Sequence, residues 1–271
     1  MDHKNFRSFS SKILLFGEYL VLQGGQSLSF PYATYSLKRS PEFSHKNRFF
    51  FHKLVKYIEQ NDNLKTKINP EFKIQVNQGL HFDSNIPVGY GLGSSGALVA
   101  AIYDSFIDDK ATEYTELKKD LAELESFFHD KSSGIDPLTS FLDKPILFDQ
   151  NGIKVIPILR LGKFNLIDSG KKRSAREAIQ HFNKLSKDTN FRLSLSELTE
   201  ISNEMVNKYV KGEDILLEMK SYSEKQFAAF KDFIPLNMQH EWQMGLESGD
   251  YCMKLCGAGM GGMFLKFNVL A

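Results

Sequence analysis

Residues 87–97 read Pro-Val-Gly-Tyr-Gly-Leu-Gly-Ser-Ser-Gly-Ala, and a helix-forming run follows at residues 98–106. Glycine lets a backbone approach an anion closely, and serines at a helix start direct free N–H groups and hydroxyls at that anion. The stretch therefore predicts a phosphate-binding loop that leads into a helix. The alternative interpretation is a glycine-rich turn in which Ser94 or Ser95 merely caps the helix.

Two other nucleotide-binding loops share part of this pattern. Gly91, Gly93 and Gly96 have the spacing of the dinucleotide-binding fingerprint. That fingerprint follows an apolar strand, whereas residues 83–87 are polar and end in a proline that would break a central strand. A Walker A loop has lysine after its last glycine, where this chain has Ala97. The sequence thus disfavours a Rossmann oxidoreductase and a Walker A protein.

The composition is that of an ordinary globular protein, and 271 residues suffice for one large domain or two medium ones. The formal net charge is +1, which gives no reason to expect a nucleic acid or a membrane as partner and does not by itself select a ligand. Cys252 and Cys256 alone cannot build a disulfide framework or a four-thiolate zinc site. Because the sequence also has no apolar run of about 18 residues, we expect a cytoplasmic protein.

Hydrophobic periodicity predicts the order of the elements. Residues 11–22 form two apolar runs broken at Gly17 and Glu18, which predicts two strands that meet at a bend. Residues 71–77 alternate between apolar and polar side chains, which predicts a half-buried strand. The other predicted helices lie at 52–60, 98–106 and 115–129, and the chain after residue 168 is largely helical as far as residue 245. The other predicted strands lie at 145–148, 153–159, 164–168, 251–255 and 263–267.

Three segments resemble signature motifs of the GHMP kinases, the family of galactokinase, homoserine kinase, mevalonate kinase and phosphomevalonate kinase. In chain order they are residues 12–25, residues 87–97 and the glycine-rich residues 257–262. In finer detail, residues 11–19 and 125–137 are most similar to a bacterial branch of the mevalonate kinases.

This resemblance implies a two-domain α/β (α+β) architecture, the GHMP kinase fold. A ribosomal protein S5 domain 2-like N-terminal domain would cover residues 1–158, and a ferredoxin-like C-terminal domain would cover residues 159–271, with ATP and the acceptor bound between them.

The resemblance also implies how the nucleotide and its metal ion are bound. The residues that would hold ATP are Pro87, Gly89, Gly91, Leu92, Gly93, Ser94, Ser95 and Gly96. Mg²⁺ would be bound by Ser95 together with Glu125, which opens the segment Glu-Ser-Phe-Phe-His-Asp-Lys-Ser-Ser-Gly-Ile-Asp-Pro at residues 125–137. His129, one helical turn after Glu125, could orient that carboxylate, and a purely structural histidine is the alternative.

For the acceptor hydroxyl, the resemblance implies two charged residues. Asp136 would be the catalytic carboxylate, and Lys12 would lower the pKa of the hydroxyl and keep Asp136 ionised. Taken alone, both residues also permit plainer interpretations. An aspartate before Pro137 is typical of a helix N-cap, and Lys12 is also consistent with a lysine that faces solvent.

The implied acceptor-binding residues are Lys12, Glu18, Tyr19, Asp136 and Ser174. Mevalonate kinases commonly have histidine at the position of Tyr19, whereas phosphomevalonate kinases often have Gly-Glu-Tyr, as this chain does. The basic run at residues 171–176 lies where mevalonate kinases contact the acceptor. It predicts an anion site for a carboxylate or a phosphate, or alternatively a solvated turn.

The sequence therefore predicts a Mg²⁺-dependent kinase that transfers the γ-phosphoryl group of ATP to the 5-hydroxyl of mevalonate, as a monomer or homodimer. Within the family, phosphomevalonate kinase and homoserine kinase are the alternatives. A catalytically silent nucleotide-binding protein is the alternative from another class, and the presence of Lys12, Ser95, Glu125 and Asp136 argues against it.

Overall fold

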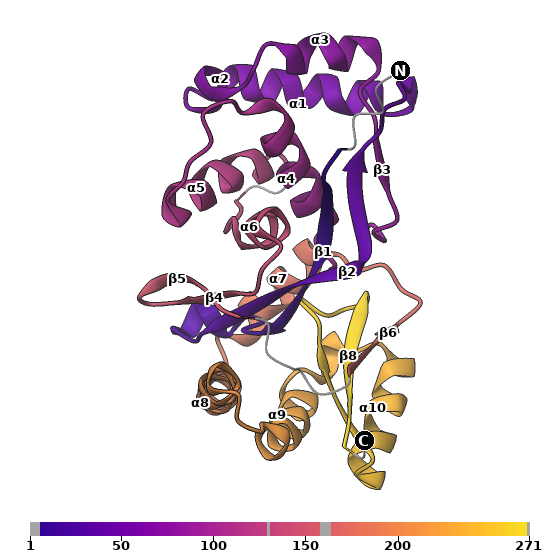
Figure 1. Ribbon diagram of the computed structural model, residues 1–271. Helices are drawn as coiled ribbons and strands as arrows, with labels where there is room; N and C mark the ends of the chain where they lie inside the picture. The colour runs from indigo at the N-terminus through magenta and orange to yellow at the C-terminus, as the bar shows by residue number, and fades with distance from the viewer. Residues whose placement is uncertain (1–5, 129–130, 158–163, 270–271) are drawn as a thin grey trace. The chain divides into compact units, whose positions relative to one another are not determined.

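The computed structural model describes residues 6–128, 131–157 and 164–269, which form two compact units (Figure 1). Within this part of the chain, unit 1 consists of residues 6–12, 31–86 and 93–144, and unit 2 consists of the remaining described residues. Two long strands, β1 (Ser8–Phe16) and β2 (Ser27–Arg39), contribute one part to each unit. Neither unit is therefore a continuous piece of the sequence.

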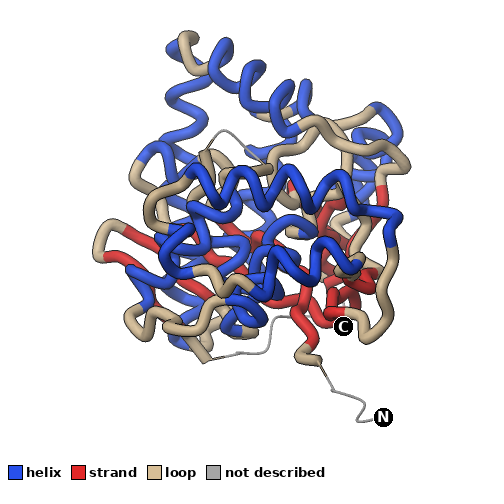
Figure 2. The backbone as a smooth tube through the Cα atoms, turned by 90° about the horizontal axis from the view of Figure 1, so that it is seen from above, coloured by secondary structure: helices blue, strands red, loops and turns tan. Residues whose placement is uncertain are grey.

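Unit 1 is built mainly of helices, drawn in blue in Figure 2. Its part of β2 pairs antiparallel with β3 (Phe82–Ser84). The helices are α1 (Arg48–Gln60), α2 (Leu64–Lys67), α3 (Glu71–Gln78), α4 (Ser94–Phe106), α5 (Tyr114–Glu125) and α6 (Ile135–Leu142), with a short 3-10 helix at His45–Asn47. The helices predicted around residues 52–60, 98–106 and 115–129 are confirmed as α1, α4 and α5, of which α5 ends earlier than predicted.

Helix α4 packs against α5 and α6 in unit 1. Its residues are largely buried, and the small residues Gly96, Ala97 and Ala100 leave room for a close neighbour. A β-carbon at Gly96 would lie 2.9 Å from the carbonyl carbon of Asp136, so a larger residue would push α6 away. The glycine therefore brings the first turns of α4 and α6 together, and with them the polar residues that both turns carry.

The strand predicted at residues 71–77 is wrong, because these residues form helix α3. Phe72 and Val76 are buried and four residues apart, while Ile74 between them is 49% exposed, as a helix requires. The Asn69 side chain accepts a hydrogen bond from the N–H of the first helical residue, and the helix ends at a glycine with a φ of 102°. These end signals, and not the alternation, decide the local structure.

The second strand predicted within residues 11–22 is also wrong. β1 ends at Phe16, Gly17 adopts a φ of 107°, and a 3-10 helix follows at Leu20–Gln23. A β-carbon at Gly17 would lie 2.7 Å from the Cα atom of Ser27, so the chain can turn here only because the residue is glycine. The predicted bend is thus confirmed. The apolar run after the bend forms a helical turn, and Leu20 of this turn is buried.

Unit 2 combines two antiparallel arrangements of strands with helices. In the first, β2 pairs with β4 (Ile146–Asp149), which pairs with β5 (Gly152–Val155). The second is a sheet in the order β6-β8-β7, made of β6 (Phe164–Asp168), β8 (Met263–Asn268) and β7 (Tyr251–Leu255). The helices are α7 (Ala175–Leu185), α8 (Thr189–Lys211), α9 (Leu216–Ala229) and α10 (Leu236–Ser248), with a 3-10 turn at Lys231–Phe233.

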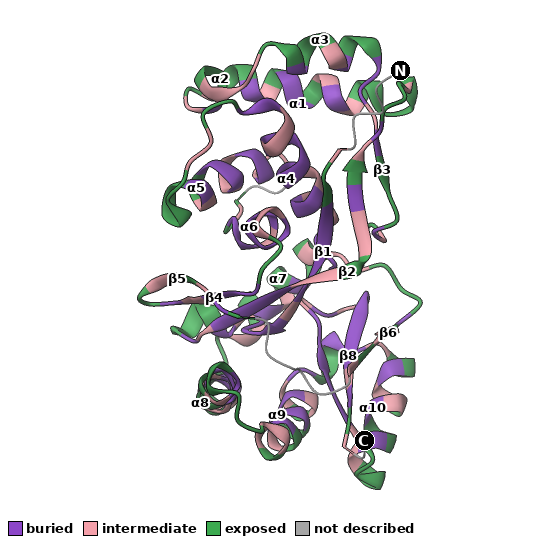
Figure 3. Cartoon of the chain, in the orientation of Figure 1, coloured by how far each residue is buried: buried purple, intermediate pink, exposed green. Residues whose placement is uncertain are grey.

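The core of unit 2 is rich in aromatic side chains. The largest of those that are almost fully buried are Trp242, Tyr222, Phe16, Phe230, Phe233 and Phe264. Figure 3 shows the middle strand β8 coloured mostly as buried. Helices α9 and α10 both pack on β7, so one sheet and two helices share this core. The predicted mixed α/β class is confirmed.

No helix in the described part of the chain combines the length and apolar character that crossing a membrane requires. The expected boundary near residue 158 falls outside the described residues. The predicted domains at residues 1–158 and 159–271 accordingly stay a prediction.

Candidate functional site

The loop at residues 87–97 has the open backbone that its glycines predict. Gly89, Gly91 and Gly93 have φ angles of 88°, 83° and 73°, in the region that favours glycine. Gly93 is the N-cap of α4, so Ser94 and Ser95 are its first helical residues. The interpretation that one of these serines merely caps the helix is therefore wrong. N–H groups at the first turn of a helix lack an intrahelical partner, which suits them to bind phosphate oxygens.

Lys12 and Asp136 form an ion pair in unit 1, with 2.8 Å between Lys12 Nζ and Asp136 Oδ1. The Lys12 side chain is 5% exposed and that of Asp136 is 33% exposed, so the lysine is fixed and the carboxylate is accessible. Lys12 also lies against the loop, because a β-carbon at Gly93 would be 2.7 Å from its Cγ atom. The interpretation of Lys12 as a solvent-facing lysine is wrong.

The N-cap interpretation of Asp136 is wrong as well. Helix α6 has Gly134 as its N-cap, with a φ of 73°, and Asp136 lies inside the first turn. A carboxylate in a first turn interacts favourably with the helix dipole, but it does not cap the helix. The Asp136 side chain is therefore available to Lys12 and to a ligand.

Glu125, at the end of α5, is a buried carboxylate beside the loop. It accepts hydrogen bonds from Ser95 Oγ at 3.1 Å and from Ser132 Oγ, and it makes no ion pair within the described residues. Burial, followed by the negative charge of Asp136, raises the pKa of Glu125 to about 7. Perturbed carboxyl groups of this kind are concentrated at functional sites. His129, the residue expected to orient Glu125, lies outside the described residues.

Glu18 and Lys254 form a buried ion pair in unit 2 that sequence reasoning missed. Their side chains are 1% and 0% exposed, and 2.5 Å separate Lys254 Nζ from Glu18 Oε1. Lys254 also donates to the carbonyl of Leu255, and the Gly257 N–H donates to Glu18 at 3.4 Å. Burial raises the pKa of Glu18 against the opposing charge of Lys254. The pair therefore joins the turn after β1 to the glycine-rich segment after β7.

Tyr19 lies on the same turn and adopts a φ of 60°, which is unusual for a residue with a side chain. Its ring stacks on Phe182 of α7 with 4.3 Å between centroids, and its hydroxyl donates to the carbonyl of Ala258 at 2.7 Å. Ser174 is the N-cap of α7 and accepts a hydrogen bond from the N–H of Glu177. The structure thus gives Tyr19 and Ser174 protein partners, and their acceptor-binding roles stay predictions.

The basic run follows β6 and touches the first half of the phosphate loop within unit 2. The Arg173 N–H donates to the Gly89 carbonyl at 2.9 Å. A β-carbon at Gly91 would lie 3.0 Å from Arg173 Cζ, and one at Gly257 would also meet the guanidinium. The guanidinium therefore lies between two glycine-rich segments, and within the described residues it forms no ion pair.

The glycines at residues 257–262 allow other backbone segments of unit 2 to approach closely. A β-carbon at Gly262 would lie 2.7 Å from the carbonyl oxygen of Tyr90, and the Met263 N–H donates to that same oxygen at 3.2 Å. A β-carbon at Gly261 would likewise lie 2.6 Å from the carbonyl oxygen of Lys171. The backbone of residues 87–92 is therefore supported by two other backbone segments of unit 2.

Part of the chain matches a known protein family. Residues 51–144 match the family model described as the GHMP kinases N terminal domain. This range contains the phosphate loop, Glu125 and Asp136. No curated protein matches the sequence significantly.

Solved structures are similar to this chain over almost all of its length. The structure of L. major mevalonate kinase in complex with R-mevalonate has a TM-score of 0.70 and 15% identity, and covers 99% of this chain and 88% of that one. The Methanococcus jannaschii mevalonate kinase has a TM-score of 0.69 and 18% identity, with 97% and 90% covered. The structure of Streptococcus pneumoniae phosphomevalonate kinase in complex with phosphomevalonate and AMPPNP has a TM-score of 0.66 and 16% identity, and the match covers 98% of this chain and 92% of that one. At these identities the likeness establishes the fold.

Proposed function

We propose, from the GHMP kinase N-terminal domain that this chain carries at residues 51–144, that it transfers the γ-phosphoryl group of ATP to an alcohol. The observation that carries the proposal is the ion pair between Lys12 and Asp136, which lies against Gly93 of the phosphate loop. Transfer to an alcohol needs a group near the phosphates that can accept the hydroxyl proton. An accessible carboxylate held by a buried lysine has the properties for this role.

In this proposal each residue of the pair has a defined task. Asp136 orients the acceptor hydroxyl and accepts its proton as the oxygen attacks the γ-phosphorus. Lys12 holds the Asp136 carboxylate in place through the ion pair and stabilises negative charge on the hydroxyl oxygen. The phosphates of ATP would be held by the backbone of the loop, through Pro87, Gly89, Gly91, Leu92, Gly93, Ser94, Ser95 and Gly96.

Glu125 and Ser95 are proposed to hold Mg²⁺. Both side chains offer oxygen ligands, which Mg²⁺ prefers, and Glu125 is a buried carboxylate that no basic side chain of the described residues pairs with. Within that part of the chain no group of three or more His, Cys, Asp or Glu side chains could hold a metal ion. Mg²⁺ at kinase sites commonly uses only one or two carboxylates together with phosphates and water. When bound, the ion would neutralise charge on the β- and γ-phosphates.

Glu125→Gln is expected to raise the Mg²⁺ concentration that half-saturates the ATP-bound protein by about 10- to 100-fold. The amide keeps the size of the side chain but removes the negative oxygen that the ion needs. Calorimetric titration of Mg²⁺ into the protein with ATP measures the change. Glu116→Gln, in the exposed first turn of the same helix, is the matched control and should leave half-saturation unchanged. An unchanged value in Glu125→Gln would exclude this residue from the metal site.

Mevalonate is the proposed acceptor, phosphorylated at its 5-hydroxyl. Residues 11–19 and 125–137 support it through their similarity to mevalonate kinases. Arg173 supports an anionic acceptor, because its guanidinium is held against Gly91 and Gly257 without a carboxylate of the described residues as partner. A guanidinium in this setting fits a carboxylate or a phosphate. Phosphomevalonate and homoserine therefore remain the alternative acceptors.

An ADP-release assay with mevalonate, phosphomevalonate, homoserine and galactose separates these acceptors. We expect the largest kcat/KM with mevalonate, and a larger value with phosphomevalonate would overturn the assignment.

Replacement of Lys172 and Arg173 by Ala should raise the KM for mevalonate by about 10- to 100-fold with little change in kcat, because charge-assisted hydrogen bonds to the acceptor are lost. Lys184→Ala, an exposed change in the last turn of α7, is the control.

A further inference from the structure

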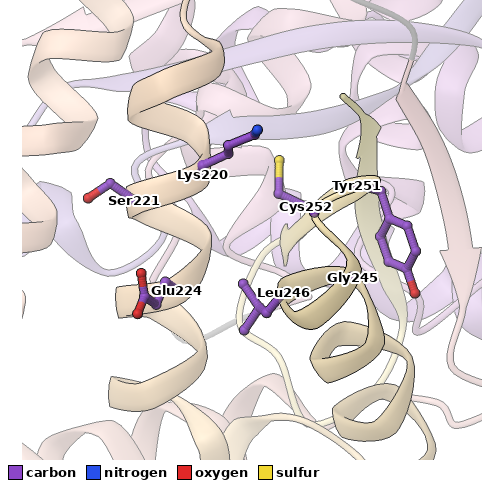
Figure 4. Close-up of a pocket in the computed structure, with 8 residues that line it drawn as sticks. Lys220, Ser221, Glu224, Gly245, Leu246, Tyr251 and Cys252 are labelled. Atoms are coloured by element: carbon purple, nitrogen blue, oxygen red, sulfur yellow. The ribbon is translucent and has the colours of Figure 1, made fainter. Parts of the chain in front are cut away.

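A cavity of about 440 Å³ lies in unit 2 among α9, the end of α10 and the start of β7 (Figure 4). Its size is in the range of pockets that hold small ligands, about 300 to 1,000 Å³. The lining residues that matter here are Lys220, Ser221 and Glu224 of α9, Leu246 of α10, and Tyr251 and Cys252 of β7. None of them belongs to the proposed phosphotransfer machinery.

The two sides of this cavity differ in chemical character. Helix α9 supplies a polar wall, on which Lys220 and Glu224 lie one helical turn apart. Across from this wall, Figure 4 shows the side chains of Leu246 and Cys252, which are apolar or nearly so. In the same view Lys220 and the Cys252 sulfur lie at one end of the cavity and Glu224 lies toward the other. A ligand would thus meet two opposite charges on one side and an apolar surface on the other.

The charged residues of α9 form two groups, one paired with helix α8 and one that lines the cavity. Glu218 and Lys225 form ion pairs with residues of α8, at 2.6 Å and 2.7 Å. Lys220 and Glu224 line the cavity, and they form no ion pair with each other or with any other described residue. A lysine one turn before a glutamate is the less favourable order for a pair within one helix. Both charges are therefore available to a ligand.

We propose that this cavity binds a small zwitterion, namely an α-amino acid with an apolar side chain. Lys220 would receive the carboxylate and Glu224 the ammonium group, while the side chain packs on Leu246 and Cys252. A ligand with a single charge would leave either Lys220 or Glu224 without a partner, which selects for the zwitterion. The proposal is independent of the phosphotransfer proposed above.

The two cysteines provide a direct report on this cavity. Cys252 and Cys256 are both buried, each 2% exposed, but of the two only Cys252 is part of the cavity wall. Burial raises the pKa of Cys252 to about 11, so its alkylation at a pH of about 9 should be slow enough to follow. Lys254 lies between the cysteines, so tryptic cleavage places them in different peptides.

The experiment measures alkylation of the native protein by iodoacetamide, an uncharged reagent, with mass spectrometry of the two peptides. L-leucine is expected to slow the reaction of Cys252 by about tenfold at a concentration ten times its Kd, since occupancy determines the accessible fraction. 4-Methylpentanoate, which lacks the ammonium group, and 3-methylbutylamine, which lacks the carboxylate, are expected to have little effect at the same concentration. Cys256 should react much more slowly than Cys252 in every case.

Surface variants test which charges carry the recognition. Lys220→Met and Glu224→Gln should each abolish protection by L-leucine, which is measured as the ratio of the alkylation rates without and with ligand in the same variant. The ratio is needed because the charge of Lys220 lowers the pKa of Cys252, so Lys220→Met by itself should slow alkylation. Lys225→Met removes the same charge from the same helix but outside the cavity, and it should retain protection. The proposal is overturned if L-leucine gives no protection, if the singly charged analogues protect equally well, or if protection survives in Lys220→Met and Glu224→Gln. Equal reaction of both cysteines would also overturn it, because the reagent would then enter by unfolding and not through the cavity.

Discussion

Asp136→Asn is expected to lower kcat by about 10²- to 10⁴-fold while ATP binding is retained. The amide preserves the shape of the side chain and its place in the first turn of α6, but it cannot accept the hydroxyl proton. Lys12, whose Nζ atom lies 2.8 Å from Asp136 Oδ1, would lose its negatively charged partner. The hydroxyl would therefore also be oriented less well. Steady-state kinetics with the preferred acceptor, combined with an equilibrium ATP-binding measurement, tests the expectation.

Two further variants distinguish catalysis from a structural role of Asp136. Asp143→Asn makes the same change at the other end of α6, where the residue has a φ of 51° that asparagine tolerates, so kcat should stay normal. Lys12→Met should also lower kcat, and combining it with Asp136→Asn should cost less than the product of the two effects, because the residues act as a unit. A near-normal kcat in correctly folded Asp136→Asn would leave positioning and the metal ion as the sources of catalysis.

Glu18→Gln is expected to lower the free energy of unfolding by about 3 to 5 kcal/mol. The substitution leaves the ammonium group of Lys254, which is 0% exposed, without its counter-charge. Lys254→Met should have an effect of similar size, because it leaves the Glu18 carboxylate buried alone. Urea denaturation of the whole chain measures both losses. The double variant Glu18→Leu with Lys254→Met should lose much less than the sum, since both charges are then absent.

An exposed ion pair of the same unit serves as the control for this series. Lys225 and Glu197 are also paired, at 2.7 Å, but their side chains are 44% and 59% exposed. Removing either charge should leave stability nearly unchanged, because water already solvates both groups. If Glu18→Gln lowered the free energy of unfolding as little as this control, water or another group would have to replace the carboxylate. The ion pair would then not hold the turn after β1 in place.

Much of the candidate site in unit 1 could be predicted from local sequence. The glycines and serines of residues 87–97 have direct conformational meaning, and the structure places the start of α4 within that stretch. The resemblance to the GHMP kinases, which rested on three short motifs, is confirmed by the domain at residues 51–144 and by the fold. Lys12 and Asp136 were singled out through that resemblance, and composition alone would have favoured plainer roles for them.

The parts that were predicted wrongly or missed depend on tertiary contacts or on competing local signals. Phe72 and Val76 satisfy the spacing of a strand and of a helix equally well, and only the helix-end signals distinguish the two. The partner of Glu18 lies 236 residues away, and no periodicity links a glutamate to a lysine at that distance. Tyr19 has an unusual φ, stacks on Phe182 and donates a hydrogen bond to the carbonyl of Ala258, and no local sequence pattern reveals these contacts.

The interleaving of the two units along the chain has a consequence for synthesis on the ribosome. All described residues of unit 1 have been made once residue 144 emerges, so this unit can fold while the rest of the chain is still being translated. Residues 13–30 belong to unit 2, and Glu18 can form its ion pair only after Lys254, 236 residues later in the chain, has been synthesised. At about 5 to 20 residues per second, that delay is on the order of tens of seconds. During this time the apolar turn after β1 stays exposed on the nascent chain, together with a carboxylate that is buried in the folded unit.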